Sequence, residues 1–324
     1  SFGPLGAKGF AFLNMLQLIG WTSIMIYDAM LALQELAPLS PMVWTIAIGA
    51  LVILWLFIGL HNTGYIQAIV SILLLGLTLY MGAHMISQWP NEGNLLISGN
   101  MSFIAALELS IAMPLSWLPL ISDYTRESKK PFSASLTSAT VYTITSIVMY
   151  ALGLSAAIFG GGDSIITIMM NAGLGLAGLI VIIFSTVTTT FMDAYSAGVS
   201  STTIYNGASS KGIAVIVTMV GTIAAILYPM DDITDFLYLI GSVFAPMIAI
   251  LLADYFINRQ QVQTLSAYLV RGLIWSLSVG LYHYMLHSES TIGATLPTFT
   301  MAFVVTAIVG FISKTAHTSA EIKQ

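Results

Sequence analysis

The chain has 324 residues, of which 57% are hydrophobic and only 7% charged, and its formal net charge is -5. Soluble domains carry roughly a quarter of charged residues, and a single soluble core of this length could not bury so much apolar surface, so the composition excludes an ordinary soluble globule. Nine Lys and Arg residues spread along the chain exclude a nucleic-acid patch, and the absence of Cys excludes disulfides, thiolate catalysis and cysteine metal sites.

Ten apolar stretches follow one another along the chain, and each is long enough to cross a bilayer as a helix, which takes about 20 residues. They cover residues 10–33, 42–60, 65–86, 102–121, 136–159, 172–204, 211–229, 234–257, 265–287 and 293–313. The sixth is longer than a span requires, so we expect it to be tilted or extended. The sequence therefore predicts an all-α integral membrane protein of about ten transmembrane helices, with a single transporter domain over residues 1–324.

If the chain crosses the membrane at each predicted helix, the basic and acidic residues named below fall on opposite sides of the membrane. All nine basic residues then share one side: Lys8, Arg126, Lys129, Lys130, Lys211, Arg259, Arg271, Lys314 and Lys323. The opposite side holds Glu35, Glu92, Asp163, Asp231, Asp232 and Glu289. Because cytoplasmic loops carry the excess of Lys and Arg, we expect both ends of the chain to be cytoplasmic in a plasma or inner membrane.

Three carboxylic acids that lie inside the predicted spans, away from their ends, are the candidates for a function: Asp28, Glu108 and Asp193. Ionisable groups in a membrane are costly and are treated first as functional, the alternative being an acid near a helix end that reaches headgroup water. Asp28 lies toward the outer end of its helix, Glu108 lies deeper, and Asp193 lies well inside the sixth stretch. Asp193 is therefore the acid for which a function is most strongly indicated.

Hydroxyl side chains share the helical face of Asp193. Spacings of three, four, seven and eight residues place Ser185, Thr186, Thr189, Thr190, Ser196 and Ser200 there. Small hydroxyl residues also pack membrane helices together, which explains part of this stripe but not the carboxylate within it. Hydroxyl oxygens suit a small hard cation, and a carboxylate can bind a cation, a proton or an N–H group of a ligand.

Trp21 lies in the middle of the first stretch, with Met25 one turn further along the same face. Tryptophan is more usual in the interfacial belts than at mid-membrane. Two interpretations stay open, namely a packed core residue and a flat stacking platform for an aromatic ligand.

Two prolines interrupt the fourth stretch, Pro114 and Pro119, with Trp117 between them. Each removes a backbone donor, so we expect the helix to break or kink. Interrupted helices near the midplane often form substrate sites in transporters, and a kink without function is the alternative.

Several local patterns in this order resemble the nucleobase:cation symporter-1 family, in particular its hydroxymethylpyrimidine transporters and cytosine permeases. They are Ser1-Phe2-Gly3 with Gly6, Gly20-Trp21, Ser122-Asp123-Tyr124-Thr125-Arg126, Tyr195-Ser196-Ala197-Gly198, Phe244-Ala245-Pro246 and Ala253-Asp254-Tyr255-Phe256. The resemblance implies a LeuT-type fold of five-plus-five inverted repeats, with this chain matching helices three to twelve. We accordingly expect that two N-terminal helices precede this sequence in its parent.

The resemblance also implies roles for individual residues. Trp21 would stack on the substrate ring, next to Met25, where the family often has a polar residue. Pro114 stands where the family usually has its second aromatic partner, and Trp117 lies nearby. Asp193 stands where relatives often carry an Asn that binds the ligand, and an Asp there suits the N–H groups of an aminopyrimidine.

A sodium-binding hydroxyl pair would fall near Thr188 and Thr189 by the same resemblance, whereas the helical face of Asp193 favours Thr186, Thr189 and Thr190. Only Thr189 satisfies both arguments. The candidate substrate residues are thus Trp21, Met25, Glu108, Pro114, Trp117 and Asp193, and the candidate sodium residues are Thr186, Thr188 and Thr189.

These features predict a secondary transporter that imports a pyrimidine-type nucleobase or the thiamine precursor hydroxymethylpyrimidine, coupled to sodium or protons and without another cofactor. An amino-acid or other small-solute symporter of the same fold is the main alternative, although its substrate carboxylate would be repelled by Asp193. An intramembrane enzyme with Asp193 and Glu108 as paired carboxylates lacks an accompanying motif. A channel would favour pore loops or charged rings, and the sequence shows neither.

Overall fold

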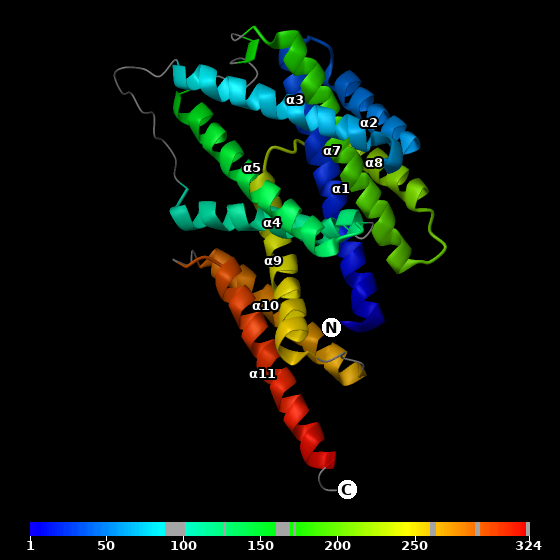
Figure 1. Ribbon diagram of the computed structural model, residues 1–324, viewed down its shortest axis with the longest axis vertical. Coiled ribbons are helices and arrows are strands. Elements are labelled where there is room, and N and C mark those ends of the chain that lie inside the picture. Colours follow the sequence, from blue (N-terminus) through cyan, green and yellow to red (C-terminus); the bar gives the residue numbers. More distant parts are fainter. Residues whose placement is uncertain are drawn as a thin grey trace. The chain divides into compact units, whose positions relative to one another are not determined.

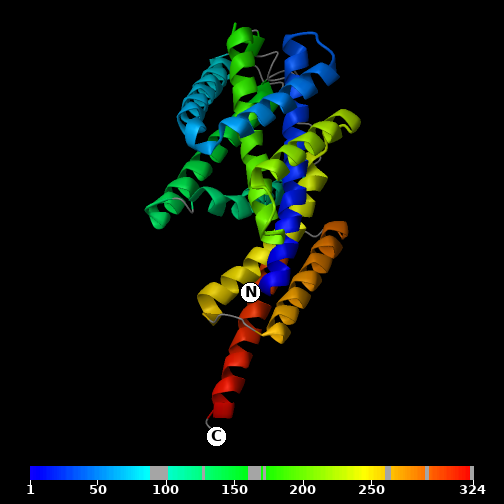
Figure 2. The ribbon, with the colours of Figure 1, turned by 90° about the vertical axis from the view of Figure 1, so that its right-hand side faces the viewer.

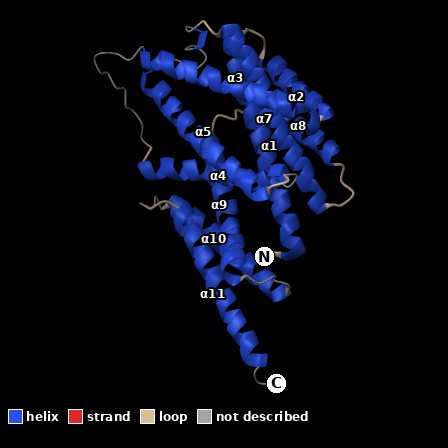
Figure 3. Ribbon diagram, in the orientation of Figure 1, coloured by secondary structure: helices blue, strands red, loops and turns tan. Residues whose placement is uncertain are grey.

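A computed structural model describes residues 1–87, 101–125, 128–159, 169–170, 173–259, 264–288 and 292–321. Within these ranges the regular structure is entirely helical, and no strand occurs (Figure 3). Ten of the helices are long and apolar enough to cross a membrane, and they coincide with the ten predicted spans. The prediction of an all-α protein with about ten spans is therefore confirmed, while the inverted-repeat arrangement stays a prediction.

The helices can be followed by colour along the chain in Figure 1. They are α1 (Gly3–Leu36), α2 (Pro41–Ile58), α3 (Leu60–Ser87), α4 (Phe103–Thr125), α5 (Pro131–Phe159), α7 (Gly175–Ile204), α8 (Ser210–Leu227), α9 (Ile233–Leu252), the π-helical turn η1 (Ala253–Asn258), α10 (Leu265–His287) and α11 (Thr295–Glu321). Helix α7, the sixth predicted span, has 30 residues. At 1.5 Å per residue this is about 45 Å, longer than the roughly 30 Å hydrocarbon core, as expected for an extended helix.

The chain packs as two compact units, each built from separate pieces of sequence. Unit 1 comprises residues 1–17, 100–121 and 232–324, and unit 2 comprises residues 18–99 and 122–231. The expectation of one transmembrane domain over residues 1–324 stays a prediction. Each unit has its own apolar core.

The core of unit 1 lies among α9, α10 and α11, which pack against one another (Figure 2). Ala249, Ile250, Ile274 and Ala302 are its buried centre. The indole of Trp275 packs against this centre, and its Nε1 donates a hydrogen bond of 2.9 Å to the carbonyl of Val243. A buried indole N–H needs such a partner, so this bond fixes α10 against α9.

A buried ion pair joins the end of α9 to α10 in unit 1. The guanidinium of Arg271 donates to both carboxylate oxygens of Asp254, at 3.0 and 3.1 Å, and the two residues are 4% and 5% exposed. Asn258 donates from Nδ2 to Asp254 Oδ1 at 2.7 Å and to the carbonyl of Thr306 at 3.2 Å. One polar cluster therefore connects η1, α10 and α11.

The core of unit 2 lies where α2, α7 and α8 meet the part of α1 that follows Gln17. Ile26, Ala29, Leu33, Ile48 and Ala225 form its buried centre. Helices α7 and α8 approach closely at Gly198, where an added Cβ would collide with the backbone oxygen of Ser210. Only glycine permits that approach without displacing α8.

Candidate functional site

The two units share the candidate residues between them. Unit 2 contains Trp21, Met25, Asp193 and the three threonines Thr186, Thr188 and Thr189, whereas unit 1 contains Glu108, Pro114 and Trp117. The structure thus places each predicted residue on its expected helix.

Asp193 lies in the interior of α7 and is 8% exposed. Its Oδ2 is fully buried, and within the described part of the chain no donor reaches it. Thr190 and Ser196, one turn away on either side, are fully buried. Of the three membrane acids, Asp28 is exposed, while Asp193 and Glu108 are buried. A buried carboxylate oxygen without a partner is costly, so this position would gain from a ligand that donates hydrogen bonds.

Met25 lies beside the Asp193 segment of α7 within unit 2. Thr190 Oγ1 donates to the thioether sulfur of Met25 at 3.6 Å, a weak hydrogen bond. Trp21 precedes Met25 by one helical turn and is half-buried. The first predicted helix therefore contacts the Asp193 segment of α7 through Met25 and Thr190, one turn before Asp193.

The candidate sodium residues differ in their surroundings. Thr188 and Thr189 both donate to the carbonyl of Ser185, at 3.0 and 2.8 Å. Thr188 is buried, Thr189 is exposed and Thr186 is half-buried. Such bonds to the preceding turn are common for threonines in helices, and they leave hydroxyl lone pairs available. The sodium site at these residues stays a prediction.

In the described ranges, no group of three His, Cys, Asp or Glu side chains comes together. A cluster of charged ligands is therefore not available there as another cation site. A coupling cation held by these residues would need hydroxyl, carbonyl or single carboxylate oxygens. Those are the ligands that sodium-sized hard cations accept.

Glu108 has a role that the sequence did not indicate. Its Oε1 accepts hydrogen bonds from the backbone N–H groups of Ala294 and Thr295, at the start of α11. Gly293, with φ of 75°, lies directly against the carboxyl group. A carboxylate satisfies the free N–H groups of a helix start and its positive end. Glu108 therefore caps α11, and the predicted contact with substrate is untested.

Helix α4 continues through Pro114 and Pro119, so the helix does not break there, and a kink at these prolines stays a prediction. Membrane helices tolerate proline because neighbouring groups satisfy the backbone around it. The carbonyls that lose their N–H partner are those of Ser110 and Leu115. The neighbouring carbonyl of Ser116 accepts a hydrogen bond of 2.9 Å from Gln17. Pro114 and Trp117 are both half-buried, and their contact with substrate stays a prediction.

Asn14 and Gln17 form a buried amide pair in α1 and were not among the residues predicted for the site. Gln17 Nε2 donates to Asn14 Oδ1 at 2.7 Å, in addition to its bond to Ser116. The available signal was two amide side chains three residues apart in an otherwise apolar stretch, a spacing that places both on one helical face.

Comparison with known proteins identifies relatives over almost the whole chain. A family described as permease for cytosine/purines, uracil, thiamine and allantoin matches residues 2–318. Cytosine permeases of Escherichia coli strain K12 and of strain O157:H7 are each 25% identical to the chain over 175 residues. That region is 54% of this chain, and it spans about two fifths (41%) of the length of these relatives. The family resemblance drawn from the sequence motifs is thereby confirmed.

Proposed function

Because the chain belongs to the family of permeases for cytosine and purines, uracil, thiamine and allantoin, we propose that it is a secondary transporter and moves a nucleobase-like solute across a membrane. Ten helices in the described ranges are long and apolar enough to cross a membrane, which supports a multi-pass membrane protein. The mechanism would be alternating access, in which one group of helices rocks against the rest around a midplane site. This family assignment argues against the intramembrane enzyme.

The observation that carries the substrate class is the buried Oδ2 of Asp193, which no donor among the described residues reaches. An aminopyrimidine offers the N–H groups of its exocyclic amine, and a hydrogen bond from such a donor to a carboxylate is charge-assisted and strong. We propose a pyrimidine with an exocyclic amine as the substrate, with hydroxymethylpyrimidine and cytosine as the two leading compounds. Cytosine permease relatives agree with this class.

The surroundings of Asp193 suit a flat ring. Met25, which lies beside Thr190, offers a polarizable thioether, and sulfur makes favourable contacts with aromatic rings. Trp21, one turn earlier, supplies the stacking surface in this proposal. Met25 cannot donate a hydrogen bond, so Asp193 would carry most of the polar recognition within unit 2.

Coupling to a cation belongs to the same proposal. The threonine oxygens at positions 186, 188 and 189 favour sodium as the coupling ion. The buried acids Asp193 and Glu108 make protons the alternative coupling ion. Substrate and cation would each raise the affinity for the other by the same factor. An amino-acid symporter of the same fold is disfavoured, because the buried carboxylate of Asp193 would repel a substrate carboxylate.

The test measures uptake of radiolabelled hydroxymethylpyrimidine, cytosine and leucine into proteoliposomes that contain the protein. Each solute is tested with an inward sodium gradient, an inward proton gradient or neither. We expect saturable uptake of one pyrimidine that depends on one gradient, and no uptake of leucine. Uptake of leucine alone would replace the pyrimidine proposal with the amino-acid alternative.

Two matched carboxylate-to-amide variants test the site. Asp193→Asn removes the charge and one acceptor, so substrate affinity should fall about 10- to 100-fold, as for lost hydrogen bonds to a charged group. Asp232→Asn is the control, because Asp232 caps α9 through Oδ1 and Asn is an equally good cap. Equal affinities in the wild type and both variants would remove Asp193 from the site.

A further inference from the structure

A buried side-chain amide joins α1 to the proline-containing part of α4, and both partners belong to unit 1. Gln17 of α1 is 4% exposed, and its Nε2 donates to the carbonyl of Ser116 at 2.9 Å and to Asn14 Oδ1 at 2.7 Å. A carbonyl can only accept, so the nitrogen of the Gln17 amide must face α4. Both N–H bonds of this nitrogen are therefore used, and one of them connects two helices.

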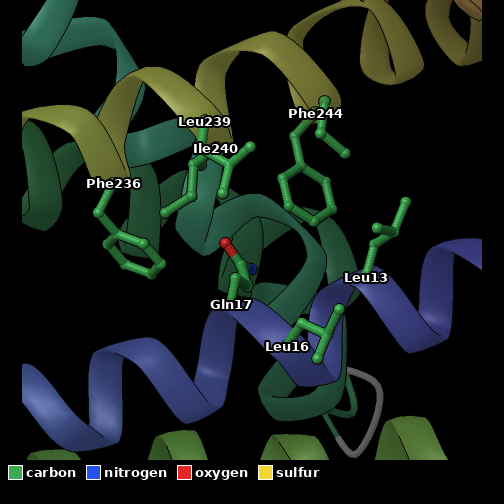
Figure 4. A pocket seen from close by; sticks show the side chains of 8 residues that line it. Leu13, Leu16, Gln17, Phe236, Leu239, Ile240 and Phe244 are labelled. Atoms are coloured by element: carbon green, nitrogen blue, oxygen red, sulfur yellow. The ribbon is translucent and has the colours of Figure 1, made fainter.

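The oxygen of the same amide has no donor. Gln17 Oε1 is fully buried, and none of the described residues donates to it. It points toward α9, whose side chains on this side are apolar, including Ile240 (Figure 4). A buried carbonyl oxygen without a partner costs about as much as two neutral hydrogen bonds contribute. Gln17 therefore adds little net stability, and a role other than stability is the better explanation for it.

The hydrogen bond to Ser116 falls on the part of α4 with the weakest backbone bonding. Pro114 and Pro119 lie inside the helix on either side of Ser116. Because proline has no N–H, the helix lacks two of its backbone bonds there. Helices bend most easily at such positions, so a contact from a neighbouring helix has more influence on the direction of α4 here than elsewhere.

This part of α4 also carries predicted substrate residues. Trp117 follows Ser116 directly, and helices interrupted near the midplane often form substrate sites in transporters. The direction of α4 at Ser116 decides where the side chain of Trp117 lies. Gln17 is too deeply buried to meet a solute itself, so its effect on a substrate site would pass through α4.

We propose that Gln17 is a positioning residue for transport, whose hydrogen bond to Ser116 holds residues 114–119 of α4 in the direction that binds the substrate. This inference rests on the proposed transport of a nucleobase-like solute. Without the bond, α4 bends more freely and only a fraction of the molecules has the binding conformation. The apparent affinity then falls in proportion to that fraction, by about two- to tenfold for one neutral hydrogen bond.

The first test compares uptake kinetics of the wild type and Gln17→Met in proteoliposomes, with the pyrimidine that the wild type transports. Methionine is unbranched and of similar length but has no N–H donor. We expect KM to rise about two- to tenfold while Vmax stays within about twofold of the wild type. A residue that only supported folding would lower Vmax through loss of active protein and leave KM unchanged. The unfolding free energy should stay close to that of the wild type, because the unpartnered oxygen is removed together with the amide.

Gln67→Met in α3 is the matched control. The Nε2 of Gln67 is also buried, but no acceptor among the described residues lies within its reach. The same substitution there removes an amide that holds no neighbouring helix through its nitrogen, so KM should not change.

The second test follows α4 without any substrate. The chain has no cysteine, so two spin labels can be attached through Phe12→Cys in α1 and Leu118→Cys in α4, both at exposed positions of unit 1. The distribution of distances between the labels, measured by electron paramagnetic resonance, should broaden in Gln17→Met and stay unchanged in Gln67→Met. A wild-type KM or a wild-type distance distribution in Gln17→Met would overturn this inference, whereas a wild type that transports no pyrimidine would refute the proposed function.

Discussion

Replacing Arg271 by Met leaves a buried carboxylate without its cation, and this change offers a direct measure of how the α9–α10 junction is stabilised. Methionine keeps much of the apolar stem, so the packing loss is small. Removal of one partner of a buried ion pair costs about 3–5 kcal/mol. Asp254 keeps the 2.7 Å hydrogen bond from Asn258, so we expect the lower end, about 3 kcal/mol.

The assay is reversible unfolding in mixed micelles of increasing SDS content, which reports the free energy of unfolding. Arg259→Met is the matched control, because Arg259 is exposed and its Nε makes one hydrogen bond, to the carbonyl of Phe256. That variant should lose at most about 1 kcal/mol. The double variant Asp254→Leu with Arg271→Met should recover most of the loss, because no charge is left buried. Equal small losses for both single arginine variants would refute the reasoning.

Three further outcomes are expected from the same unfolding assay and from the transport assay. Glu108→Gln keeps an acceptor but removes the charge at the start of α11, so it should cost about 1 kcal/mol. Gly198→Ala should cost about 1–3 kcal/mol, because its Cβ would collide with the carbonyl of Ser210; Gly280→Ala, which meets open space, should be neutral or stabilise by up to about 1 kcal/mol. Asp193→Asn should lower substrate affinity while leaving the unfolding free energy within about 1 kcal/mol of the wild type, since one of its oxygens already lacks a partner.

The ten spans were predictable because crossing a bilayer requires a local, uninterrupted apolar stretch, and each stretch can be read without knowing its neighbours. The predicted start of α1 was less accurate. The apolar stretch begins at residue 10, whereas the helix begins at Gly3. Hydropathy shows which part of a segment meets lipid. The backbone hydrogen bonds of the helix continue beyond that part, through Lys8 to Gly3.

The burial of Asp193 was also predictable, because its position deep inside a long apolar stretch leaves little alternative. The role of Glu108 was not, since its partners Ala294 and Thr295 lie more than 180 residues further along the chain. The hydrogen bond from Gln17 to the carbonyl of Ser116 depends equally on a contact between distant helices. Sequence patterns identify which residues are unusual in a membrane, and only the packing decides what each of them contacts.

The π-helical turn at the end of α9 determines which way the side chains after it point. The N–H of Arg259 bonds to the carbonyl of Asp254, five residues earlier, so this turn accommodates one residue more than an α-helix would. If the same residues wound as an ordinary α-helix, everything beyond the turn would be rotated by about 100°. Asn258 would then turn away from Thr306, and α11 would lose its polar connection to this turn. The wide winding of this short segment, as much as its composition, decides which helices it joins.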